Sequence, residues 1–238
     1  MDVAGSVALV TGANRGLGAA FCRVLLEQGA SKVYAGARDP DTVEVAGVIP
    51  VRLDITSPTD VAAAVAQCGD TTLLVNNAGI LTGTLVLADD ALEGARREFE
   101  TNVFGTLSMS GAFAPVLGAN GGGAMVNVLS VLSWLSVPAG ALYCASKAAA
   151  WSLTNALRLE LLDQHTQVVA LHVGYMDTDM AAGVEAPKAS PDDVAGQALA
   201  AVEAGAFEVL ADDTSRYVRG ALSADLTALY PALASSPS

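Results

Sequence analysis

The sequence predicts an α/β protein with a doubly wound parallel sheet and helices on both faces of that sheet. Three observations support this prediction. Short runs of small and branched apolar residues, typical of strands buried on both faces, alternate with longer segments of helical periodicity. A glycine-rich turn joins the first of these strands to the first helix. The length of 238 residues suits one large core, and no linker divides it, so we expect residues 1–238 to form a single domain.

The first strand is expected at residues 7–10, and the glycine-rich turn follows it directly. A helical segment then covers residues 19–28 and ends at Gly29. This order favours a Rossmann-type dinucleotide-binding unit, because glycines permit positive φ angles and let the backbone approach a pyrophosphate that faces the helix N-terminus. The turn residues expected to bind the dinucleotide are Gly12, Asn14, Arg15, Gly16, Leu17 and Gly18.

The second strand, expected at residues 32–37, bears on the choice of dinucleotide. NAD-binding proteins commonly place an acidic residue at the end of this strand, where it bonds the ribose 2′-hydroxyl. Here Ala37 occupies that position and Arg38 follows it. Arg38 and Arg15 can converge on a 2′-phosphate, so the sequence predicts NADP(H) in preference to NAD(H). The alternative, two ordinary surface arginines, stays open. Between Arg38 and Asp54 there is little room for a helix, which implies a trimmed sheet edge.

Tyr143 and Lys147 lie four residues apart in a helical segment, so their side chains share one face of that helix. A unit charge about 5 Å away contributes roughly 3 kcal/mol at an effective dielectric of 20, or ~2 pKa units. We therefore expect Lys147 to lower the pKa of Tyr143 toward neutrality, where the phenol can give and take protons. Taken alone, the pair is also typical of an ordinary solvated helix face.

Together, the glycine-rich turn and the Tyr-x-x-x-Lys pair resemble the short-chain dehydrogenase/reductase family, over residues from about Val7 to Thr178. Further landmarks lie in the family's order. Residues 73–79 resemble its fourth strand and Asn-Asn-Ala-Gly signature, and residues 126–130 resemble its fifth strand, which ends in a serine. The resemblance implies an oxidoreductase that moves a hydride between a nicotinamide and a carbonyl carbon.

The resemblance also implies a catalytic set. Tyr143 would supply the proton, Ser130 would bind the same substrate oxygen, and Lys147 would hold the nicotinamide ribose. The backbone of Asn102 would hold a water that touches Lys147. Ser133 offers a second hydroxyl but lies three residues out of the family's register. Beyond the glycine-rich turn, the expected dinucleotide contacts are Arg38, Asp54, Ile55, Asn77, Ala78, Gly79, Tyr143, Lys147, Gly174 and Thr178.

The later part of the chain departs from the family pattern. Val173 replaces the proline of the Pro-Gly-x-x-x-Thr turn, which loosens φ there and leaves the roles of Gly174 and Thr178 less certain. The segment that usually covers the substrate, residues 180–190, is short and interrupted by proline, so we expect a small lid. An apolar substrate pocket could be lined by Leu81, Trp134 and Tyr175, although an aromatic residue there could equally belong to the core.

Assembly is also affected. Many tetrameric relatives end with a strand and an Asp-Gly-Gly signature. This chain instead has residues 207–213 without that signature, and a helix is expected after them through about Tyr230. The usual tetramer is therefore in doubt. A homodimer through the long helical segments 92–117 and 141–162 remains reasonable, because both carry many small or apolar residues. Core packing explains those residues equally well.

Charge and composition exclude several other classes. The net charge of −13 disfavours nucleic acids and anionic membranes as partners. There is no apolar run of eighteen residues and no basic leader, so we expect a cytoplasmic protein. Three cysteines without metal-ligand spacing predict neither a metal site nor a disulfide framework. We expect His172, in a strand-like run, to be structural and not a catalytic base.

The sequence therefore predicts an NADPH-preferring carbonyl reductase, reversible as an alcohol dehydrogenase, that acts on a small ketone, aldehyde or alcohol. Two alternatives remain. One is an NAD(H)-dependent alcohol or steroid-type dehydrogenase. The other is a dinucleotide-sensing protein without turnover, which the presence of Ser130, Tyr143 and Lys147 together disfavours.

Overall fold

The computed structural model describes residues 1–235, and a seven-stranded sheet of order β3-β2-β1-β4-β5-β6-β7 forms its centre. Every pair of neighbouring strands is parallel. The chain winds outward from β1 in one direction and then from β4 in the other, which confirms the predicted doubly wound Rossmann-type fold. The strands are β1 (Val7–Thr11), β2 (Lys32–Ala37), β3 (Ile49–Arg52), β4 (Leu73–Asn76), β5 (Gly123–Val128), β6 (Thr166–His172) and β7 (Glu208–Leu210).

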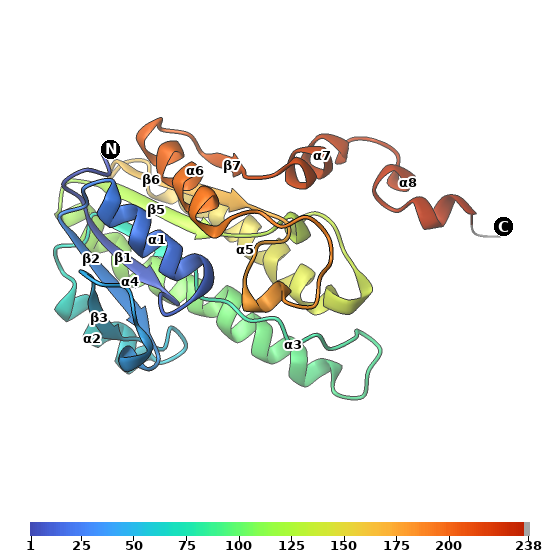
Figure 1. Cartoon of the computed structure of the whole chain (residues 1–238), viewed down its shortest axis with the longest axis horizontal. Coiled ribbons are helices and arrows are strands. Elements are labelled where there is room, and N and C mark those ends of the chain that lie inside the picture. Colours follow the sequence, from blue (N-terminus) through green and yellow to red (C-terminus); the bar gives the residue numbers. More distant parts are fainter. Residues whose placement is uncertain (236–238) are drawn as a thin grey trace.

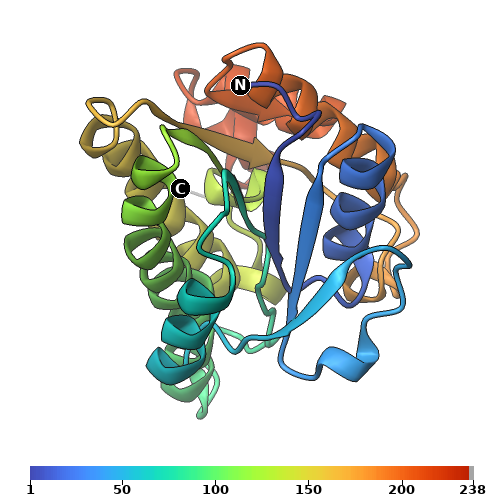
Figure 2. The same ribbon diagram turned by 90° about the vertical axis from the view of Figure 1, so that its left-hand side faces the viewer.

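Helices cover both faces of the sheet, as Figures 1 and 2 show. On one face, α1 (Gly16–Glu27) and α6 (Pro191–Glu203) enclose an apolar core. On the other face, α2 (Pro58–Gln67), α4 (Thr106–Ala119) and α5 (Ala141–Glu160) enclose a second core. Strand β1 supplies both, because its side chains alternate: Ala8 and Val10 enter the first core and Leu9 enters the second. No helix within residues 1–235 is long and apolar enough to cross a membrane.

The connection between β2 and β3 contains only a short 3-10 turn, η1 (Pro40–Thr42), which agrees with the trimmed edge expected there. The long helix expected at residues 92–117 is interrupted. It consists of α3 (Ala91–Phe99), a π-helical segment η2 (Glu100–Gly105) and then α4. Gly105 lies tightly against Ile55, since a Cβ on it would fall 2.7 Å from the Ile55 Cδ1.

The C-terminal part corrects one sequence prediction. The helix expected through about Tyr230 is two shorter helices, α7 (Asp213–Ala221) and α8 (Leu226–Leu229), followed by the 3-10 segment η6 (Pro231–Ser235). Asp225 is the N-cap of α8, and its side chain accepts a hydrogen bond from the Thr227 N–H at 2.9 Å. In Figure 1 these helices extend beyond the end of β7, on the side where α5 begins.

Candidate active site

The predicted site residues gather at the carboxyl ends of the central strands. The glycine-rich turn follows β1, Asn77 follows β4, Ser130 follows β5 and Gly174 follows β6. Strand order reverses between β1 and β4, and ligands of such sheets bind outside the carboxyl ends of the strands at this switch point. The topology therefore brings together segments that are far apart in the sequence.

The glycine-rich turn has the backbone shape that its sequence predicts. Gly12 and Gly16 have φ angles of 63° and 53°, which favour glycine. A Cβ on Gly18 would lie 2.1 Å from the Gly12 carbonyl oxygen, so only glycine lets α1 pack this closely. Helix α1 has no side-chain cap, which leaves N–H groups of its first turn available to an anion. The residues present thus fit a dinucleotide pyrophosphate.

An open hollow of about 720 Å³ adjoins this turn. Asn14, Arg15 and Gly16 line it from the turn, and residues 44–46 line it from the segment after η1. Leu17, by contrast, is buried beneath α1 and belongs to the core of that face. Of these turn residues, the structure therefore turns Asn14 and Arg15 outward and Leu17 inward.

Asn77 holds the turn after β4 against the glycine-rich turn. Its side-chain amide donates to the carbonyl oxygens of Thr11 and Gly12, at 2.9 and 3.2 Å. The Thr11 hydroxyl in turn accepts the N–H groups of Asn77 and Ala78, both at 3.0 Å. The first role of this asparagine is therefore to join β1 to β4, as buried backbone groups require partners.

Asn102 occupies the π-helical segment and is buried. Its side chain accepts the Ile80 N–H at 2.8 Å and donates to the Ile80 carbonyl at 2.9 Å and to the Ser146 hydroxyl at 3.0 Å. Gly79 lies between this side chain and the predicted lysine: a Cβ there would fall 3.1 Å from Asn102 Oδ1 and 3.7 Å from Lys147 Nζ. Asn102, Gly79 and Lys147 are thus neighbours, and the water expected at the Asn102 backbone remains a prediction.

Helix α5 presents Tyr143 and Lys147 on the same face. The Lys147 Nζ lies 5.5 Å from the centre of the Tyr143 ring and donates a 2.8 Å hydrogen bond to the Val128 carbonyl at the end of β5. Lys147 is buried and Tyr143 is half-buried. Ser130 follows two residues after Val128, and its hydrogen bond with the Tyr143 side chain lowers the pKa of the phenol.

The direction of the Tyr143 pKa shift corrects the sequence prediction. Burial raises the pKa of the phenol above its ordinary value, with smaller contributions from Cys144 and Glu98, and this outweighs the hydrogen bond with Ser130. Burial also lowers the pKa of Lys147 to about 8. The expected shift of Tyr143 toward neutrality by Lys147 is therefore wrong, because desolvation disfavours the charged form of both groups. At neutral pH the phenol keeps its proton and Lys147 remains largely charged.

The two serines after β5 have different partners. Ser133 uses its hydroxyl to accept the Ser130 N–H at 3.4 Å, as part of the turn η3 (Val131–Ser133). The Ser130 hydroxyl accepts the Leu132 N–H at 3.1 Å and lies 3.4 Å from the Val173 carbonyl oxygen. Ser133 is thus turned toward the backbone of Ser130, whereas Ser130 is the serine in contact with Tyr143.

Arg15 and Arg38 have different carboxylate neighbours. Arg15 pairs with Asp179 at 3.3 Å, and both side chains are largely exposed. Arg38 lies near Asp54, whose pKa is lowered chiefly by a hydrogen bond from the Thr56 N–H and, to a smaller extent, by the positive charge of Arg38. The structure thus associates the two guanidiniums with separate acids, and their convergence on one phosphate remains a prediction.

The segment after β6 is short, as expected for a small lid. Gly174 donates its N–H to the Asp212 carboxylate, and Thr178 lies beside the glycine-rich turn, because a Cβ on Gly16 would fall 3.3 Å from the Thr178 Cγ2. Backbone hydrogen bonds between Ala189 and residues 175–177 join the two ends of this segment. Thr178 therefore lies near the turn, whereas Gly174 contacts Asp212, and the contacts of both residues with the dinucleotide remain predictions.

The three residues expected in the substrate pocket do not behave alike. Leu81 packs beside Gly140 at the start of α5, and Leu81 and Tyr175 are 40% and 49% exposed. Trp134 instead stacks on His172, with ring centroids 3.7 Å apart and planes inclined by 20°, and meets the edge of Trp151 at 5.9 Å. The structure thus assigns Trp134 to internal packing, while Leu81 and Tyr175 lie at the surface.

His172 is buried, as the prediction of a structural residue requires, but its contact was not foreseen. Its Nδ1 lies 3.0 Å from the carbonyl oxygen of Ser130. Burial is the main cause that lowers the pKa of His172 to about 4. The contact joins positions 42 residues apart in the sequence, so no local pattern indicates it.

Comparison with known proteins agrees with this geometry. Residues 6–189 match the family model for short chain dehydrogenases, and the chain belongs to the short-chain dehydrogenase/reductase family. It is an NAD(P)-dependent oxidoreductase that acts on hydroxyl or carbonyl groups. A crystal structure of a short chain dehydrogenase from Burkholderia cenocepacia, in complex with NADP, is 43% identical, has a TM-score of 0.93 and aligns over 100% of both chains.

Two curated relatives are similar over most of their length. The cis-4-hydroxycyclohexanecarboxylate dehydrogenase of Sinomonas cyclohexanicum is 34% identical, over 91% of this chain and 93% of the relative. The 3-alpha-(or 20-beta)-hydroxysteroid dehydrogenase of Mycobacterium bovis is 33% identical, over 91% of this chain and 86% of the relative. Both names describe a dehydrogenase of a hydroxyl compound, and they differ in substrate.

The depressed pKa of His172 predicts a pH dependence of stability. In the unfolded state His172 becomes protonated below about pH 6.5, whereas in the folded state it stays neutral down to about pH 4. The free energy of unfolding therefore falls as the pH drops from about 6.5 to about 4, by about 3 kcal/mol at most. Urea unfolding at several pH values should show a smaller loss for His172→Asn than for the unmodified protein. The control His165→Asn, at an exposed histidine with φ of 57°, should retain the full loss. Equal pH profiles for all three proteins would contradict the assignment.

Proposed function

We propose that the protein is an NADPH-preferring carbonyl reductase that also runs in reverse as an alcohol dehydrogenase. The observation that carries this proposal is Tyr143, a phenol kept protonated by burial, in contact with Ser130 and with Lys147 5.5 Å from its ring. A protonated donor suits the reductive direction, in which the carbonyl oxygen must gain a proton. We further propose that residues 1–238 act as one dinucleotide-binding and catalytic domain in the cytoplasm.

The proposed mechanism assigns one task to each side chain. The glycine-rich turn and Lys147 would hold the dinucleotide, which would supply the hydride when bound. Ser130 and Tyr143 donate hydrogen bonds to the substrate oxygen, where negative charge grows during reduction, and Tyr143 then transfers its proton to that oxygen. Donors placed in advance stabilise the transition state more than the ground state. Lys147 stays largely charged below about pH 8, so a positive charge lies beside the phenolate that Tyr143 becomes after it has transferred its proton.

The preference for NADPH rests on residues around the ribose end of the turn. β2 ends at the buried Ala37 without an acidic side chain, and Arg38 follows it. An ion pair as exposed as that of Arg15 with Asp179 contributes little, so Arg15 can exchange this carboxylate for a phosphate. The Burkholderia cenocepacia structure, which contains NADP, supports the same choice.

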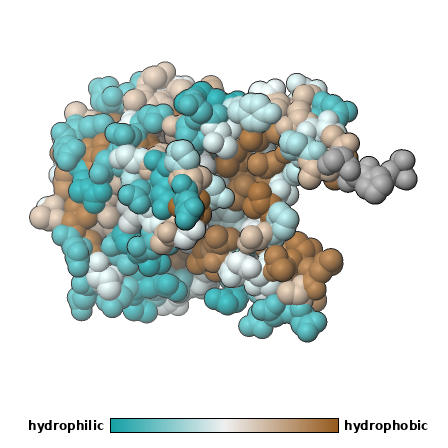
Figure 3. All heavy atoms as spheres, turned by 45° about the vertical axis from the view of Figure 1, so that its right-hand side comes forward, coloured by the Kyte–Doolittle hydropathy of each residue, from teal (hydrophilic) through white to brown (hydrophobic). Residues whose placement is uncertain are grey.

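The mouth of the site favours a neutral carbonyl compound with apolar substituents. The loop after Gly79 exposes Leu85, Val86 and Leu87, and the lid exposes Met180, each by more than half. Figure 3 shows a hollow on this side of the molecule, with hydrophobic surface inside it and on the projection below it. The net charge of −13 opposes anionic substrates.

One of the two alternatives has support. The steroid dehydrogenase of Mycobacterium bovis, together with the exposed apolar mouth, favours a steroid-type alcohol dehydrogenase as the second candidate, and a titration with both dinucleotides separates the two cofactor choices. A sensor without turnover is disfavoured, because a site for that purpose has no need of the Ser130, Tyr143 and Lys147 arrangement.

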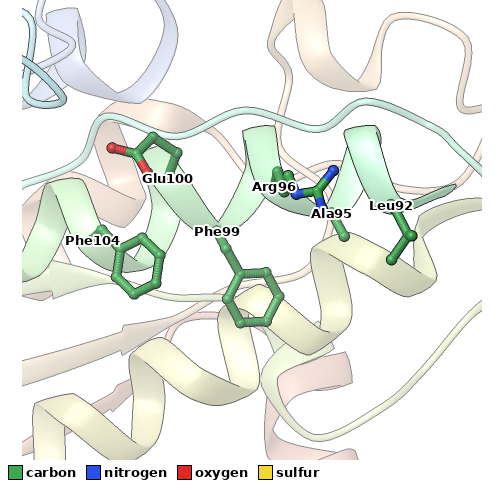
Figure 4. Close-up of a pocket in the computed structure, with 6 residues that line it drawn as sticks. All are labelled: Leu92, Ala95, Arg96, Phe99, Glu100 and Phe104. Carbon is green, nitrogen blue, oxygen red and sulfur yellow. The ribbon is translucent and has the colours of Figure 1, made fainter. Parts of the chain in front are cut away.

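We propose that the protein forms a homodimer through α3, η2, α4 and α5. Leu92 of α3, Phe104 of η2 and Leu107 of α4 are 72%, 54% and 43% exposed. Leu159 and Leu162, at and just after the end of α5, are also exposed. A hollow of about 340 Å³ lies on α3 and η2. Figure 4 shows that the side chains of Leu92, Phe99 and Phe104, which line it, point to the same side of these helices. Burial of such a face against its copy removes this apolar area from water.

Replacement of Tyr143 tests the mechanism. Tyr143→Phe should lower the turnover number by ~100-fold or more, because the proton donor is lost, while the Kd for NADPH measured by fluorescence stays close to that of the unmodified protein. Lys147→Ala should weaken both NADPH binding and turnover, since Lys147 is proposed to hold the ribose as well. Near-normal turnover of Tyr143→Phe in a panel of ketones and aldehydes would refute the assignment.

The cofactor preference can be reversed. The double substitution Ala37→Asp with Arg38→Gln should move the ratio of kcat/KM values toward NADH by at least ~10-fold, because it removes charge-assisted hydrogen bonds and adds an acceptor for the ribose hydroxyl. Arg216→Gln on α7 serves as the matched control and should leave the ratio unchanged. An unmodified protein that already prefers NADH, or an unchanged ratio in the double variant, would overturn the NADPH assignment.

The assembly prediction is tested by light scattering. The unmodified protein should have the mass of a dimer, and Phe104→Asp should give a monomer, because a carboxylate would be buried at the proposed interface. Phe207→Asp, at a similarly exposed phenylalanine of 55%, should remain dimeric. A tetramer that persists at all concentrations, or a dimer unaffected by Phe104→Asp, would contradict this interface.

A further inference from the structure

A buried polar contact lies directly behind the proposed catalytic serine. The imidazole of His172, fully shielded from solvent at the end of β6, approaches the Ser130 carbonyl oxygen at 3.0 Å. That carbonyl also accepts the Ser133 N–H at 3.0 Å, within the turn that follows Ser130. The backbone of Ser130 is thus held from two sides, and one of the two donors is a side chain that the mechanism above does not use.

Chemistry settles which ring nitrogen carries the proton. A carbonyl oxygen can only accept, so Nδ1 must be the donor in the neutral ring. Nε2 then has no hydrogen-bond partner in residues 1–235, and the nearest charged group is the Glu208 carboxylate on β7, with Oε1 at 3.8 Å. Glu208 itself pairs with Arg219 of α7 at 3.1 Å. A buried ring with an unpaired nitrogen costs free energy, and its single hydrogen bond is to the backbone of the catalytic serine.

The orientation of this ring is fixed by packing. Trp134 stacks on it with ring centroids 3.7 Å apart, and the Arg219 guanidinium lies 5.5 Å from the Trp134 ring on another side. Trp134 belongs to the loop that joins Ser130 to Tyr143. The same loop is held once more by the C-terminal part, because the Ser136 N–H donates to the Tyr230 hydroxyl at 2.9 Å.

We propose that His172 is a positioning residue, which fixes Ser130 through its backbone carbonyl and is itself held by Trp134 and the C-terminal helices. The proposal rests on the proposed function. The physical reason for this role is that the carbonyl and the hydroxyl belong to the same residue, Ser130. Rotation of this peptide unit therefore displaces the hydroxyl from Tyr143 and from the substrate oxygen. A misplacement of about 1 Å at a reacting centre can cost ~100-fold in rate.

Two substitutions separate hydrogen bonding from packing. His172→Asn keeps an N–H donor close to the position of Nδ1 but leaves part of the ring volume empty. His172→Phe keeps a planar ring for Trp134 to stack on but has no donor. If His172 positions Ser130, kcat should fall by ~10- to 100-fold in His172→Phe and should stay within ~3-fold of the unmodified protein in His172→Asn. The Kd for NADPH should change in neither variant.

A purely structural role predicts a different result. The cavity in His172→Asn would lower the folded fraction of that variant, but turnover per folded molecule would be equal in all three proteins. Equal turnover per folded molecule, or a larger loss of turnover in His172→Asn than in His172→Phe, would overturn the proposal. The measurement is a ketone titration with NADPH, with the folded fraction of each variant checked by circular dichroism.

A double-substitution cycle tests whether His172 acts through Ser130. In a Ser130→Ala background, the further change His172→Phe should leave kcat unchanged, because the hydroxyl to be positioned is absent. Losses that multiply would show that His172 acts by another route and would overturn the proposal.

Hydrogen exchange supplies a readout that needs no turnover. The N–H groups of Leu132 and Ser133 bond the hydroxyl and carbonyl of Ser130, so residues 131–136 should exchange faster in His172→Phe and at the normal rate in His172→Asn. Equal protection in all three proteins would overturn the proposal. If the unmodified protein reduced no carbonyl compound, the proposed function would fail, while this exchange experiment would still decide whether His172 positions Ser130.

Discussion

The close approach of α1 to the end of β1 is the constraint on which the rest of the site depends. Gly18 lies so near the Gly12 carbonyl that any side chain would overlap it, with a Cβ only 2.1 Å away. This contact places the N-terminus of α1 at the centre of the sheet edge. Asn77 then ties the next strand to the same turn by bonding the Thr11 and Gly12 carbonyls. A dinucleotide site and a catalytic site can share one edge because these backbones meet there.

The residues of the proposed catalytic site are held by buried polar contacts and not by surface charges. Lys147 bonds the Val128 carbonyl, Asn102 bonds both backbone groups of Ile80, and His172 bonds the Ser130 carbonyl. Each of these side chains is buried, so its hydrogen bond has little competition from water. The same burial sets the proton chemistry. It keeps Tyr143 protonated and brings the pKa of Lys147 to about 8, which together suit a proton donor in reduction.

The sequence predicted most of the secondary-structure elements correctly, but it predicted fewer of the tertiary contacts that their side chains make. The strands, the trimmed edge between β2 and β3 and the shared helix face of Tyr143 and Lys147 followed from periodicity and spacing. The π-helical segment around Asn102 and the break before α8 did not, since both depend on contacts and caps that no hydrophobic pattern encodes. Trp134 was expected either to line the substrate pocket or to belong to the core, and it packs on His172. A tryptophan has the same apolar character in either place, so the sequence contains no signal that separates them.

The sequence by itself determined the parallel sheet, the glycine-rich turn and the order of Ser130, Tyr143 and Lys147, because each is a local pattern of residue type and spacing. Only the tertiary structure decided the environment of those groups. Arg15 pairs with Asp179, 164 positions away, and His172 meets Ser130 across 42 positions. The pKa of Tyr143 moves opposite to the direction that its neighbour Lys147 alone suggested. The physical reason is that desolvation depends on every segment packed around a group, whereas helical spacing reports only the residues on its own helix.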